Sequence, residues 1–406
     1  MPEAVIVATA RTPIGRAMKG SLKNMRPDDL TAFIVDTALN KVPELDRNTV
    51  DDLILGCGQP AGESGYNLAR VVAVQAGMAT VPGVTVNRYC SSSLMSIRMA
   101  AHAIKAGEGD AFVAAGVETV SRFISGMADS GPHNDKFADA EARSAEYAGG
   151  GKGAWEPIKG SLPDIYVAMG QTAENVASSE GVSREEQDEY AALSQQRASE
   201  SLENGFWENE ITPVETVDDE GNKVTVSTDD GIRAGTTKEG LAKLKPVFRP
   251  DGTVTAGNAC PLNDGAAAVI VMSDTKASEL GLTPIARIVS SGVTGLDPEI
   301  MGLGPIEASR QALARAGMTI DDIDLVEINE AFAAQVIPSA KALGIPWDKL
   351  NVNGGAIAVG HPFGMTGARI MNTLLNGLQK DGKTFGLETM CVGGGQGMAM
   401  VIERLS

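Results

Sequence analysis

Apolar and polar positions recur along the first part of the chain with two periods. Short runs rich in valine and isoleucine predict strands, whereas longer stretches with apolar residues three and four positions apart predict amphipathic helices. The predicted strands are 4–8, 51–55 and 84–87, and the predicted helices are 28–40, 67–76 and 92–106. Strands that alternate with helices are typical of a parallel sheet covered by helices.

The same alternation returns in the last third of the chain. The predicted strands there are 266–272, 325–329 and 350–353, and the predicted helices are 305–316 and 332–343. Short motifs also match in placement between the halves: Val50-Asp-Asp-Leu-Ile-Leu-Gly with Ile320-Asp-Asp-Ile-Asp-Leu-Val, and Thr85-Val-Asn with Asn351-Val-Asn. We therefore predict a duplicated α/β unit whose equivalent loops face one another across a pseudo-twofold axis.

A segment between about 121 and 255 interrupts this pattern. It is rich in Gly, Asp and Glu, is broken by Pro132, Pro157 and Pro163, and contains one clear amphipathic helix, 183–203. We interpret it as an insertion of loops around helices. The predicted domains are an N-terminal half (1–120 with 263–284), an inserted loop domain (121–262) and a C-terminal half (285–406).

Composition narrows the classes of protein. With 406 residues and 43% apolar content the chain can bury a large core, and a formal charge of −18 argues against nucleic acid as a partner. No window approaches eighteen apolar residues and no basic, apolar leader is present, so we expect no membrane span and a cytoplasmic location. The four cysteines are irregularly spaced without a CxxC pair, which favours free thiols and no metal site.

One of these cysteines, Cys90, lies between the predicted strand 84–87 and the predicted helix 92–106. Ser91, Ser92 and Ser93 are plausible caps of that helix, whose N-terminus would favour the thiolate. A small buried apolar residue is the alternative interpretation of Cys90.

His361 is one of three histidines and lies among glycines, which allow close approach of a ligand or another loop. The duplication places it on the turn equivalent to that of Cys90, where it could act as a base. A structural histidine is the alternative. His102 and His133 lack such surroundings, and we expect both to be structural or exposed.

Cys391 and Asn329 also occupy places where chemistry is common. Cys391 begins Cys-Val-Gly-Gly-Gly-Gln-Gly, whose glycines expose N–H donors for an oxyanion; a tight hairpin with a buried thiol is the alternative. Asn329 follows a predicted strand at its carboxyl end and could hold a water or a carbonyl, or cap the next helix. Gly56-Cys-Gly-Gln-Pro-Ala61 matches a dinucleotide-binding loop only weakly, because no acidic residue follows at the required distance.

Four segments, in this order and spacing, resemble the active-site segments of thiolases, and the resemblance covers nearly the whole chain. They are Asn87-Arg-Tyr-Cys90-Ser-Ser-Ser-Leu, Asn329-Glu-Ala-Phe-Ala, Gly354-Gly-Ala-Ile-Ala-Val-Gly-His361-Pro-Phe-Gly and Cys391-Val-Gly-Gly-Gly-Gln-Gly. The resemblance implies an α/β fold of the duplicated, five-layered αβαβα type with a loop domain inserted in the N-terminal half.

The resemblance also implies roles for these residues. Cys90 would be the nucleophile that becomes acylated, His361 would activate it, and Cys391 would serve as acid and base at the α-carbon. Two oxyanions need separate donors: His361 with a water on Asn329 for the enolate, and the N–H groups of Cys90 and Gly393 for the tetrahedral carbon.

Coenzyme A enters as a substrate, and no permanently bound cofactor is implied. The residues implied to contact coenzyme A or the acyl substrate are Arg233, Ala256, Cys260, Met169, Ala331 and Phe332. Two positions depart from the family. Cys260-Pro261 replaces a small pair that usually supplies a hydroxyl, and Ser93 stands where glycine is usual, which could narrow the turn.

The segment Val167-Ala-Met-Gly170 lacks the histidine that biosynthetic acetoacetyl-CoA thiolases carry before Met-Gly. Alanine there leaves room near the acyl group, so we expect thiolysis of 3-ketoacyl-CoA in fatty-acid β-oxidation. Condensation of two acetyl-CoA is the alternative, and a non-catalytic acyl-CoA or lipid-binding relative is a distant one. A ketosynthase-type enzyme would use a second histidine or an asparagine in place of Cys391. The resemblance further implies a homodimer or homotetramer and allows association with other β-oxidation enzymes.

Overall fold

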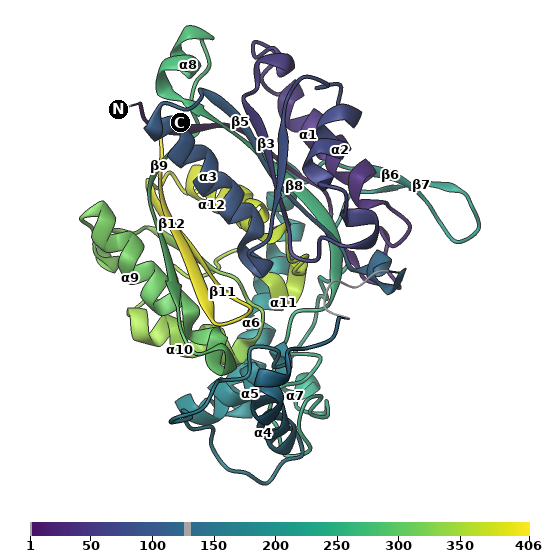
Figure 1. Cartoon of the computed structure of the whole chain (residues 1–406), viewed down its shortest axis with the longest axis vertical. Coiled ribbons are helices and arrows are strands. Elements are labelled where there is room, and N and C mark those ends of the chain that lie inside the picture. Colours follow the sequence, from purple (N-terminus) through teal and green to yellow (C-terminus); the bar gives the residue numbers. More distant parts are fainter. Residues whose placement is uncertain (1, 126–130) are drawn as a thin grey trace.

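The computed structural model describes residues 2–125 and 131–406, and a mixed sheet runs through its centre (Figure 1). The order of the strands in this sheet is β10-β11-β12-β9-β1-β8-β5-β3-β4, with β2 paired to β8. The strands are β1 (Ala4–Arg11), β2 (Gly15–Arg16), β3 (Asp52–Cys57), β4 (Gly83–Val86), β5 (Ala111–Thr119), β8 (Asn263–Ser273), β9 (Ala286–Gly295), β10 (Leu325–Ile328), β11 (Phe385–Val392) and β12 (Gln396–Arg404).

The sheet consists of two half-sheets that barely touch. β1 and β9 pair only at Val5 with Arg287 and at Ile6 with Ala286. Outward from this junction the N-terminal half runs β1-β8-β5-β3-β4 and the C-terminal half runs β9-β12-β11-β10. The two halves therefore have the same strand order, and the predicted duplication is confirmed.

The C-terminal half lacks a full counterpart of β4. Leu350 forms a single parallel bridge with Val326 at the place where β4 pairs with β3 in the other half. The predicted strand 350–353 is therefore wrong. Asn351 has a positive φ of 44° and turns its side chain onto the backbone of Ile328, so the chain leaves the sheet after one residue.

Helices cover both half-sheets and also separate them. The helices are α1 (Pro27–Asn40), α2 (Leu68–Gln75), α3 (Ser92–Ala106), α4 (Ala138–Ala148), α5 (Met169–Glu180), α6 (Arg184–Glu203), α7 (Lys238–Leu241), α8 (Asp274–Glu279), α9 (Gly304–Ala316), α10 (Ala333–Leu343), α11 (Ala356–Val359) and α12 (Thr366–Lys380). No helix in the described ranges is long and apolar enough to cross a membrane.

Three helical layers alternate with the two half-sheets. α1 and α2 pack on the outer face of the N-terminal half, and α9 and α10 on that of the C-terminal half. α3 and α12 lie side by side in the centre, where their apolar residues join both half-sheets in one core (Figure 1). This is the five-layered αβαβα arrangement that the resemblance to thiolases implies.

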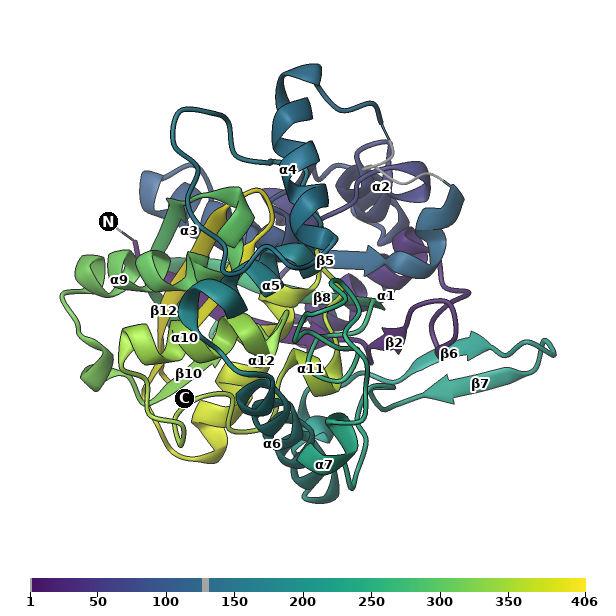
Figure 2. The ribbon, with the colours of Figure 1, turned by 90° about the horizontal axis from the view of Figure 1, so that it is seen from below.

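Most elements of the inserted segment gather at one end of the molecule. α4, α5 and α7 lie together below the half-sheets (Figure 1), whereas the hairpin of β6 (Val214–Val217) and β7 (Lys223–Val226) projects from the body (Figure 2). α6 matches the predicted helix 183–203 and begins with a capping box between Ser183 and Glu186. α4, α5 and the hairpin are not predicted by the pattern of apolar and polar residues.

Glycines allow the two central helices to approach very closely. A Cβ atom on Gly367 of α12 would lie 2.3 Å from the backbone nitrogen of Leu94 in α3. A Cβ atom on Gly116 of β5 would lie 2.1 Å from the carbonyl oxygen of Gly364, just before α12. Both obstacles are backbone atoms, which cannot move aside as a flexible side chain can. A side chain at either position would therefore push the packed segments of the two halves apart.

We predict that Gly367→Ala lowers the free energy of unfolding by about 1–3 kcal/mol, because the added methyl group overpacks this contact. Chemical denaturation monitored by circular dichroism measures the change. Gly295→Ala is the matched control, since a Cβ atom there would meet only the carbonyl oxygen of Gly395 at 3.8 Å. Equal stabilities of the two variants would contradict the prediction.

Candidate active site at the junction of the two halves

Cys90 lies on a short 3-10 turn, Tyr89–Ser91, between β4 and α3. The hydroxyl of Ser92 closes this turn: it accepts a bond from the backbone N–H of Arg88 at 2.9 Å and donates to the carbonyl of Tyr89 at 2.7 Å. Ser91 is the N-cap residue of α3, but its side chain makes no capping bond, so the prediction that these serines cap the helix is wrong. They shape the turn instead.

Ser93, which departs from the family pattern, joins the two halves. Its hydroxyl accepts a hydrogen bond from the backbone N–H of Ala368 in α12 at 2.9 Å. The side chain is fully buried and packs over Gly116, where no Cβ atom stands in its way. A serine is therefore accommodated here without displacing the turn.

His361 follows α11 and is held on both sides of its ring. The hydroxyl of Thr366 donates to the carbonyl of Pro362 at 2.8 Å, so its oxygen accepts the N–H of His361 Nδ1 at 2.6 Å. This network leaves Nε2 without a proton, and Nε2 lies 3.3 Å from Nδ2 of Asn329. Burial, and then the charge of Arg369, lower the pKa of His361 to about 3, so the ring is neutral.

Asn329 comes directly after β10 and is almost fully buried. Phe332 is the N-cap residue of α10, so Asn329 does not cap that helix. Its amide nitrogen faces His361, while its Oδ1 accepts no hydrogen bond from the described residues. A buried acceptor of this kind suits a bound water or a substrate donor.

Cys391 lies in β11, one residue before the end of the strand, and is fully buried. The hairpin from β11 to β12 turns at Gly394 and Gly395, whose positive φ values of 75° and 76° favour glycine. Gly393 precedes them and presents its backbone N–H to the sulfur of Cys90. Burial raises the pKa of Cys391 well above its usual range, and the neighbouring sulfurs of Cys90 and Cys260 raise it further.

The electrostatics of Cys90 differ from the sequence expectation. Burial raises the pKa of Cys90 to about 12, although the N–H groups of Gly393 and of Cys90 itself act in the opposite direction. The expectation that the helix N-terminus favours a resting thiolate is therefore wrong, because desolvation outweighs the donors. A thiol and a neutral imidazole rest in this site, rather than an ion pair.

A cavity of about 500 Å³ opens over Cys90. The described residues that line it are Gln59, Tyr89, Cys90, Gly131, Pro132, His133, Ile165, Tyr166, Val167, Met169, Phe363, Gly393 and Gly394. His133 is exposed, as expected; it also lines the cavity, stacks on Tyr166 with ring centroids 3.9 Å apart and contacts Glu141 at 2.8 Å. No sequence signal distinguished His133.

The predicted contacts of coenzyme A are spread more widely. Met169 lines the cavity, whereas Arg233 and Ala256 are exposed outside it. Cys260 donates its backbone N–H to the carbonyl of Ala331 at 3.0 Å. Phe332, which follows Ala331, packs its ring edge-to-face against Phe248. The chain around 256–260 is thereby joined to the chain that follows Asn329.

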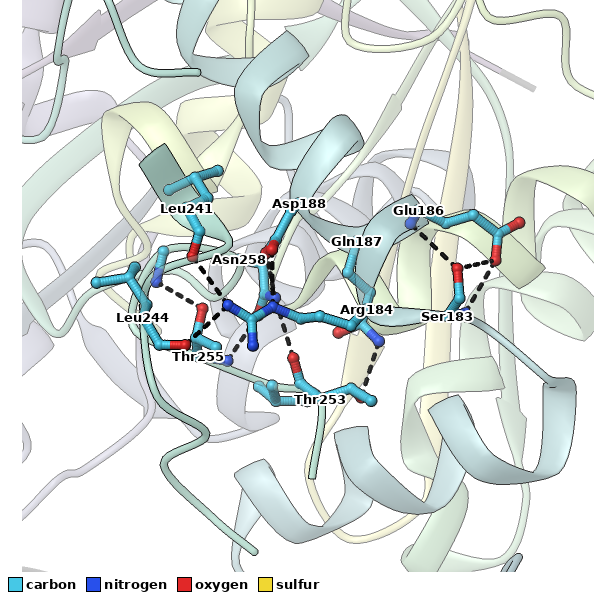
Figure 3. A network of polar contacts seen from close by, with 12 residues as sticks. Ser183, Arg184, Glu186, Gln187, Asp188, Leu241, Leu244, Thr253, Thr255 and Asn258 are labelled. Carbon is cyan, nitrogen blue, oxygen red and sulfur yellow. Dashed lines mark hydrogen bonds and ion pairs between the residues drawn. The ribbon is translucent and has the colours of Figure 1, made fainter. Parts of the chain in front are cut away.

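A polar network holds the segment around residues 256–260, which is predicted to contact coenzyme A, against α6 (Figure 3). Asn258 donates to Asp188 at 2.9 Å and accepts from the backbone N–H of Thr255 at 2.8 Å. Arg184 pairs with Asp188 at 2.7 Å and donates to the carbonyls of Leu241 and Leu244. The backbone on both sides of Ala256 is therefore fixed by side chains of the inserted segment.

Two residues that position the site were not singled out in the sequence. Thr366 fixes the tautomer of His361, and only its place five residues later, at the start of a helix, could have suggested this. Glu118 at the end of β5 accepts the backbone N–H groups of Gly58, Gln59 and Gly364. It thus joins the loop after β3 to the segment that carries His361, a contact between distant parts of the sequence that no local pattern reveals.

Family models account for almost the whole chain. The thiolase N-terminal domain matches residues 4–275, and the thiolase C-terminal domain matches residues 282–404. The chain therefore belongs to the thiolase family.

Individual relatives agree over their full length. A 3-ketoacyl-CoA thiolase of Bacillus subtilis is 45% identical over 99% of this chain and 100% of the relative. A beta-ketoadipyl-CoA thiolase of Acinetobacter baylyi is 43% identical over the whole of both chains. Among solved structures, human mitochondrial 3-ketoacyl-CoA thiolase has a TM-score of 0.86 at 36% identity, covering 100% of this chain and 99% of the other. The acetyl-CoA acetyltransferase of Bacillus anthracis has a TM-score of 0.85 at 39% identity, with the same coverage.

The resting protonation of Cys90 can be measured by alkylation. Below a pKa of about 12 the thiolate fraction grows with pH, so we expect the rate of modification by iodoacetamide to rise about tenfold per unit between roughly pH 6 and pH 9. Mass spectrometry of peptides containing Cys90 gives the rate, and Cys90→Ser is the control. A rate that is flat over this interval would instead indicate a thiolate–imidazolium pair.

Proposed function

We propose that this protein is an acyltransferase that cleaves 3-ketoacyl-CoA with coenzyme A, yielding acetyl-CoA and a shortened acyl-CoA. The observation that carries the proposal is the neutral base: Thr366 holds the proton on Nδ1 of His361 and leaves Nε2 free, in a site that also contains the thiols of Cys90 and Cys391. The names of the curated relatives support the same reaction.

In the first half of the reaction, His361 Nε2 takes the proton of Cys90 as its sulfur attacks the 3-keto carbon. The bond between the α- and β-carbons then breaks, and its electron pair forms the enolate of acetyl-CoA. Cys391 donates its thiol proton to the α-carbon of this enolate. Its raised pKa suits this duty, because the thiol keeps its proton until a strong carbon base forms.

In the second half, the Cys391 thiolate takes the proton of an incoming coenzyme A thiol. The coenzyme A sulfur attacks the acyl group on Cys90, and the Cys90 thiolate leaves and recovers its proton from His361. Both residues thus return to their resting states, and the acyl group has passed from carbon to sulfur without a permanently bound cofactor.

The donors for the two oxyanions lie on separate elements. The N–H of Gly393 faces the sulfur of Cys90, which fits the tetrahedral carbon formed there. His361 and a water held by the unpaired Oδ1 of Asn329 fit the thioester oxygen of the enolate. Because the donors are fixed by backbone and buried side chains, little reorganisation accompanies the chemistry.

Coenzyme A itself would lie along the inserted segment. Arg233 is exposed in part: desolvation of its covered portion, and then the charge of Arg16, lower its pKa, so Arg16 acts on Arg233 as a neighbouring cation in an otherwise acidic protein. Such a pair suits the phosphates of coenzyme A. The exposed Ala256 and the half-buried Cys260 would then follow the pantetheine towards Cys90, with Met169, Ala331 and Phe332 closer to the acyl group.

The lining of the cavity favours an uncharged acyl chain. Of the described residues around it, none is a lysine or an arginine, and the one histidine, His133, is already held by Glu141. A terminal carboxylate such as that of 3-ketoadipyl-CoA would lose its hydration there without a cationic partner. Ala168 lies between Val167 and Met169, two residues of the lining, and leaves room for methylene groups.

We predict that kcat/KM for 3-ketohexanoyl-CoA exceeds that for 3-ketoadipyl-CoA at least about tenfold, since an unpaired buried carboxylate costs more than about 1.4 kcal/mol. The two substrates have the same number of acyl carbons and differ in the carboxylate. Acetoacetyl-CoA, assayed in parallel, tests the chain length. Cleavage of acetoacetyl-CoA far faster than of medium- and long-chain substrates would favour the biosynthetic alternative, condensation of two acetyl-CoA.

The division of labour between the two thiols tests the function directly. Cys90→Ser should abolish formation of an acyl-enzyme, detected by mass after addition of an acyl-CoA. Cys391→Ser should still acylate from a simple acyl-CoA but should lose exchange of the α-protons of acetyl-CoA with deuterated water. Retained thiolysis in Cys90→Ser, or unchanged exchange in Cys391→Ser, would overturn the assignments.

A homodimer or homotetramer, association with other β-oxidation enzymes and a cytoplasmic location belong to the same proposal and stay predictions. The exposed edge of β4 offers a place for a second copy, because its residues are only partly buried at the end of the sheet. Size-exclusion chromatography with light scattering measures the oligomeric state.

A further inference from the structure

The duplication produces two equivalent grooves, one along each central helix. α3 and α12 both contain fifteen residues, and the seventh, tenth, eleventh and fourteenth of each line a groove. In α3 these residues are Arg98, Ala101, His102 and Lys105, and in α12 they are Asn372, Leu375, Asn376 and Gln379. We call these the α3 groove, of about 330 Å³, and the α12 groove, of about 470 Å³.

Each groove is bounded by the first strand of the opposite half and by a cation near the end of the helix that covers that strand. In the α3 groove, NH1 of Arg315 donates to the carbonyl of Ser291 in β9 at 2.6 Å. Beside the α12 groove, Nζ of Lys41, which is not part of the lining, donates to the carbonyl of Thr9 in β1 at 2.7 Å, and the lining itself includes Lys380. The grooves are thus equivalent in the helix and the strand that line them.

The protein places a carboxylate of its own in the wall of the α12 groove. Glu210, which follows α6 and a short 3-10 helix, lines this groove. Its carboxylate accepts bonds from the hydroxyl of Thr373 at 3.1 Å and from Nδ2 of Asn376 at 3.4 Å, and Nδ2 of Asn376 also donates to the carbonyl of Phe206 at 3.0 Å. This carboxylate of the inserted segment therefore meets two polar side chains of α12, and its shortest contact, at 2.6 Å, is the ion pair with Arg11 of β1.

The α3 groove has stronger donors and no such carboxylate. Over the described ranges, Arg98, Lys105 and Arg315 form no ion pair with any carboxylate. Arg98 donates to the hydroxyl of Ser291 at 3.1 Å and Lys105 to the carbonyl of Ile288 at 3.4 Å, which leaves further N–H groups on both.

The charges in the α3 groove therefore act on one another without compensation. Burial lowers the pKa of His102, and Arg98, Lys105 and Arg315 lower it further. Burial also lowers the pKa of Arg98, as do the charges of Arg88 and Arg315. A concentrated positive charge of this kind is unexpected in a chain with a net charge of −18.

We propose that the α3 groove is a binding site for a small oxyanion, a phosphate or carboxylate group, which occupies the place that the Glu210 carboxylate takes in the α12 groove. α3 carries arginine and lysine where α12 carries asparagine and glutamine. Charged donors bind an anion from solution more strongly than neutral amides do. The groove shares no lining residue with the cavity over Cys90, so this ligand is distinct from the acyl substrate. Its volume lies near the lower end of the usual range for small-molecule sites.

His102 makes the proposal measurable without an activity assay. An anion beside it favours the imidazolium, so inorganic phosphate should shift its titration to higher pH than chloride does at equal ionic strength. The chain has only three histidines, so NMR of histidine-labelled protein resolves them, and His102→Asn assigns the signal. His133, already paired with Glu141, is the internal control and should not move. An unchanged His102 titration, or equal shifts of both residues, would overturn the proposal.

Calorimetry with phosphate and with succinate then separates the two sources of oxyanion. We expect Arg98→Gln combined with Arg315→Gln to weaken binding at least about tenfold, since a hydrogen bond to a charged group contributes roughly 1.5–3 kcal/mol. Arg310→Gln combined with Lys341→Gln removes the same charge from exposed positions outside the groove and should leave binding unchanged. Lys105→Gln removes only one long hydrogen bond, so it can replace the double variant in this test if the double variant unfolds.

Equal binding by the groove variant and its control contradicts the proposal. So does a groove variant that changes the oligomeric state while phosphate has no effect, because a second copy would then cover the groove.

Discussion

The close contact between the N-terminal ends of α3 and α12 is the constraint on which the rest of this molecule depends. Gly367 lies against the backbone of Leu94, and Gly364 lies against that of β5, at separations that exclude a Cβ atom. Cys90 precedes one of these helices by two residues and His361 precedes the other by five. Any loosening of the contact would therefore move the proposed nucleophile and the proposed base apart, in a site where small displacements cost rate.

Burial at this contact also decides the electrostatics. A thiol at a helix N-terminus is usually more acidic, but here desolvation raises the pKa of Cys90 and lowers that of His361, so neither group is charged at rest. Charge then appears only as the reaction proceeds. The N–H of Gly393 is in place to donate to one developing oxyanion, and the unpaired oxygen of Asn329 is in place to hold a water that donates to the other. The absence of bulk water around these buried groups strengthens both interactions. The same burial raises the pKa of Cys391 and keeps its proton in place. A protonated thiol can donate a proton but is a poor nucleophile, which fits the proposed role of Cys391 as an acid.

The sequence predicted the layered fold well because the patterns that determine it are local. Alternation of strands and helices, and the matched motifs of the two halves, are visible within short windows. It failed where tertiary context decides. β5 is buried on both faces and therefore shows no alternation, and the predicted strand 350–353 ends after one bridge because Asn351 adopts a left-handed conformation and bonds to β10. The roles of Thr366 and Glu118 arise from contacts with the backbone of distant loops, which residue types alone do not reveal.

Duplication explains both the site and its asymmetry. Two copies of one α/β unit present two equivalent turns across the junction, and the chain carries the proposed nucleophile, Cys90, on one and the proposed base, His361, on the other. The segment inserted in the first copy then crosses to the second, where Glu210 enters the groove beside α12 and pairs with Arg11 of β1. Among the described residues, the insertion contributes Asn209 and Glu210 to the lining of the groove beside α12 and no residue to the lining of the groove beside α3. Arg98, His102 and Lys105 stand at the positions of α3 where α12 carries asparagine and glutamine, so positive charge gathers there without a carboxylate beside it.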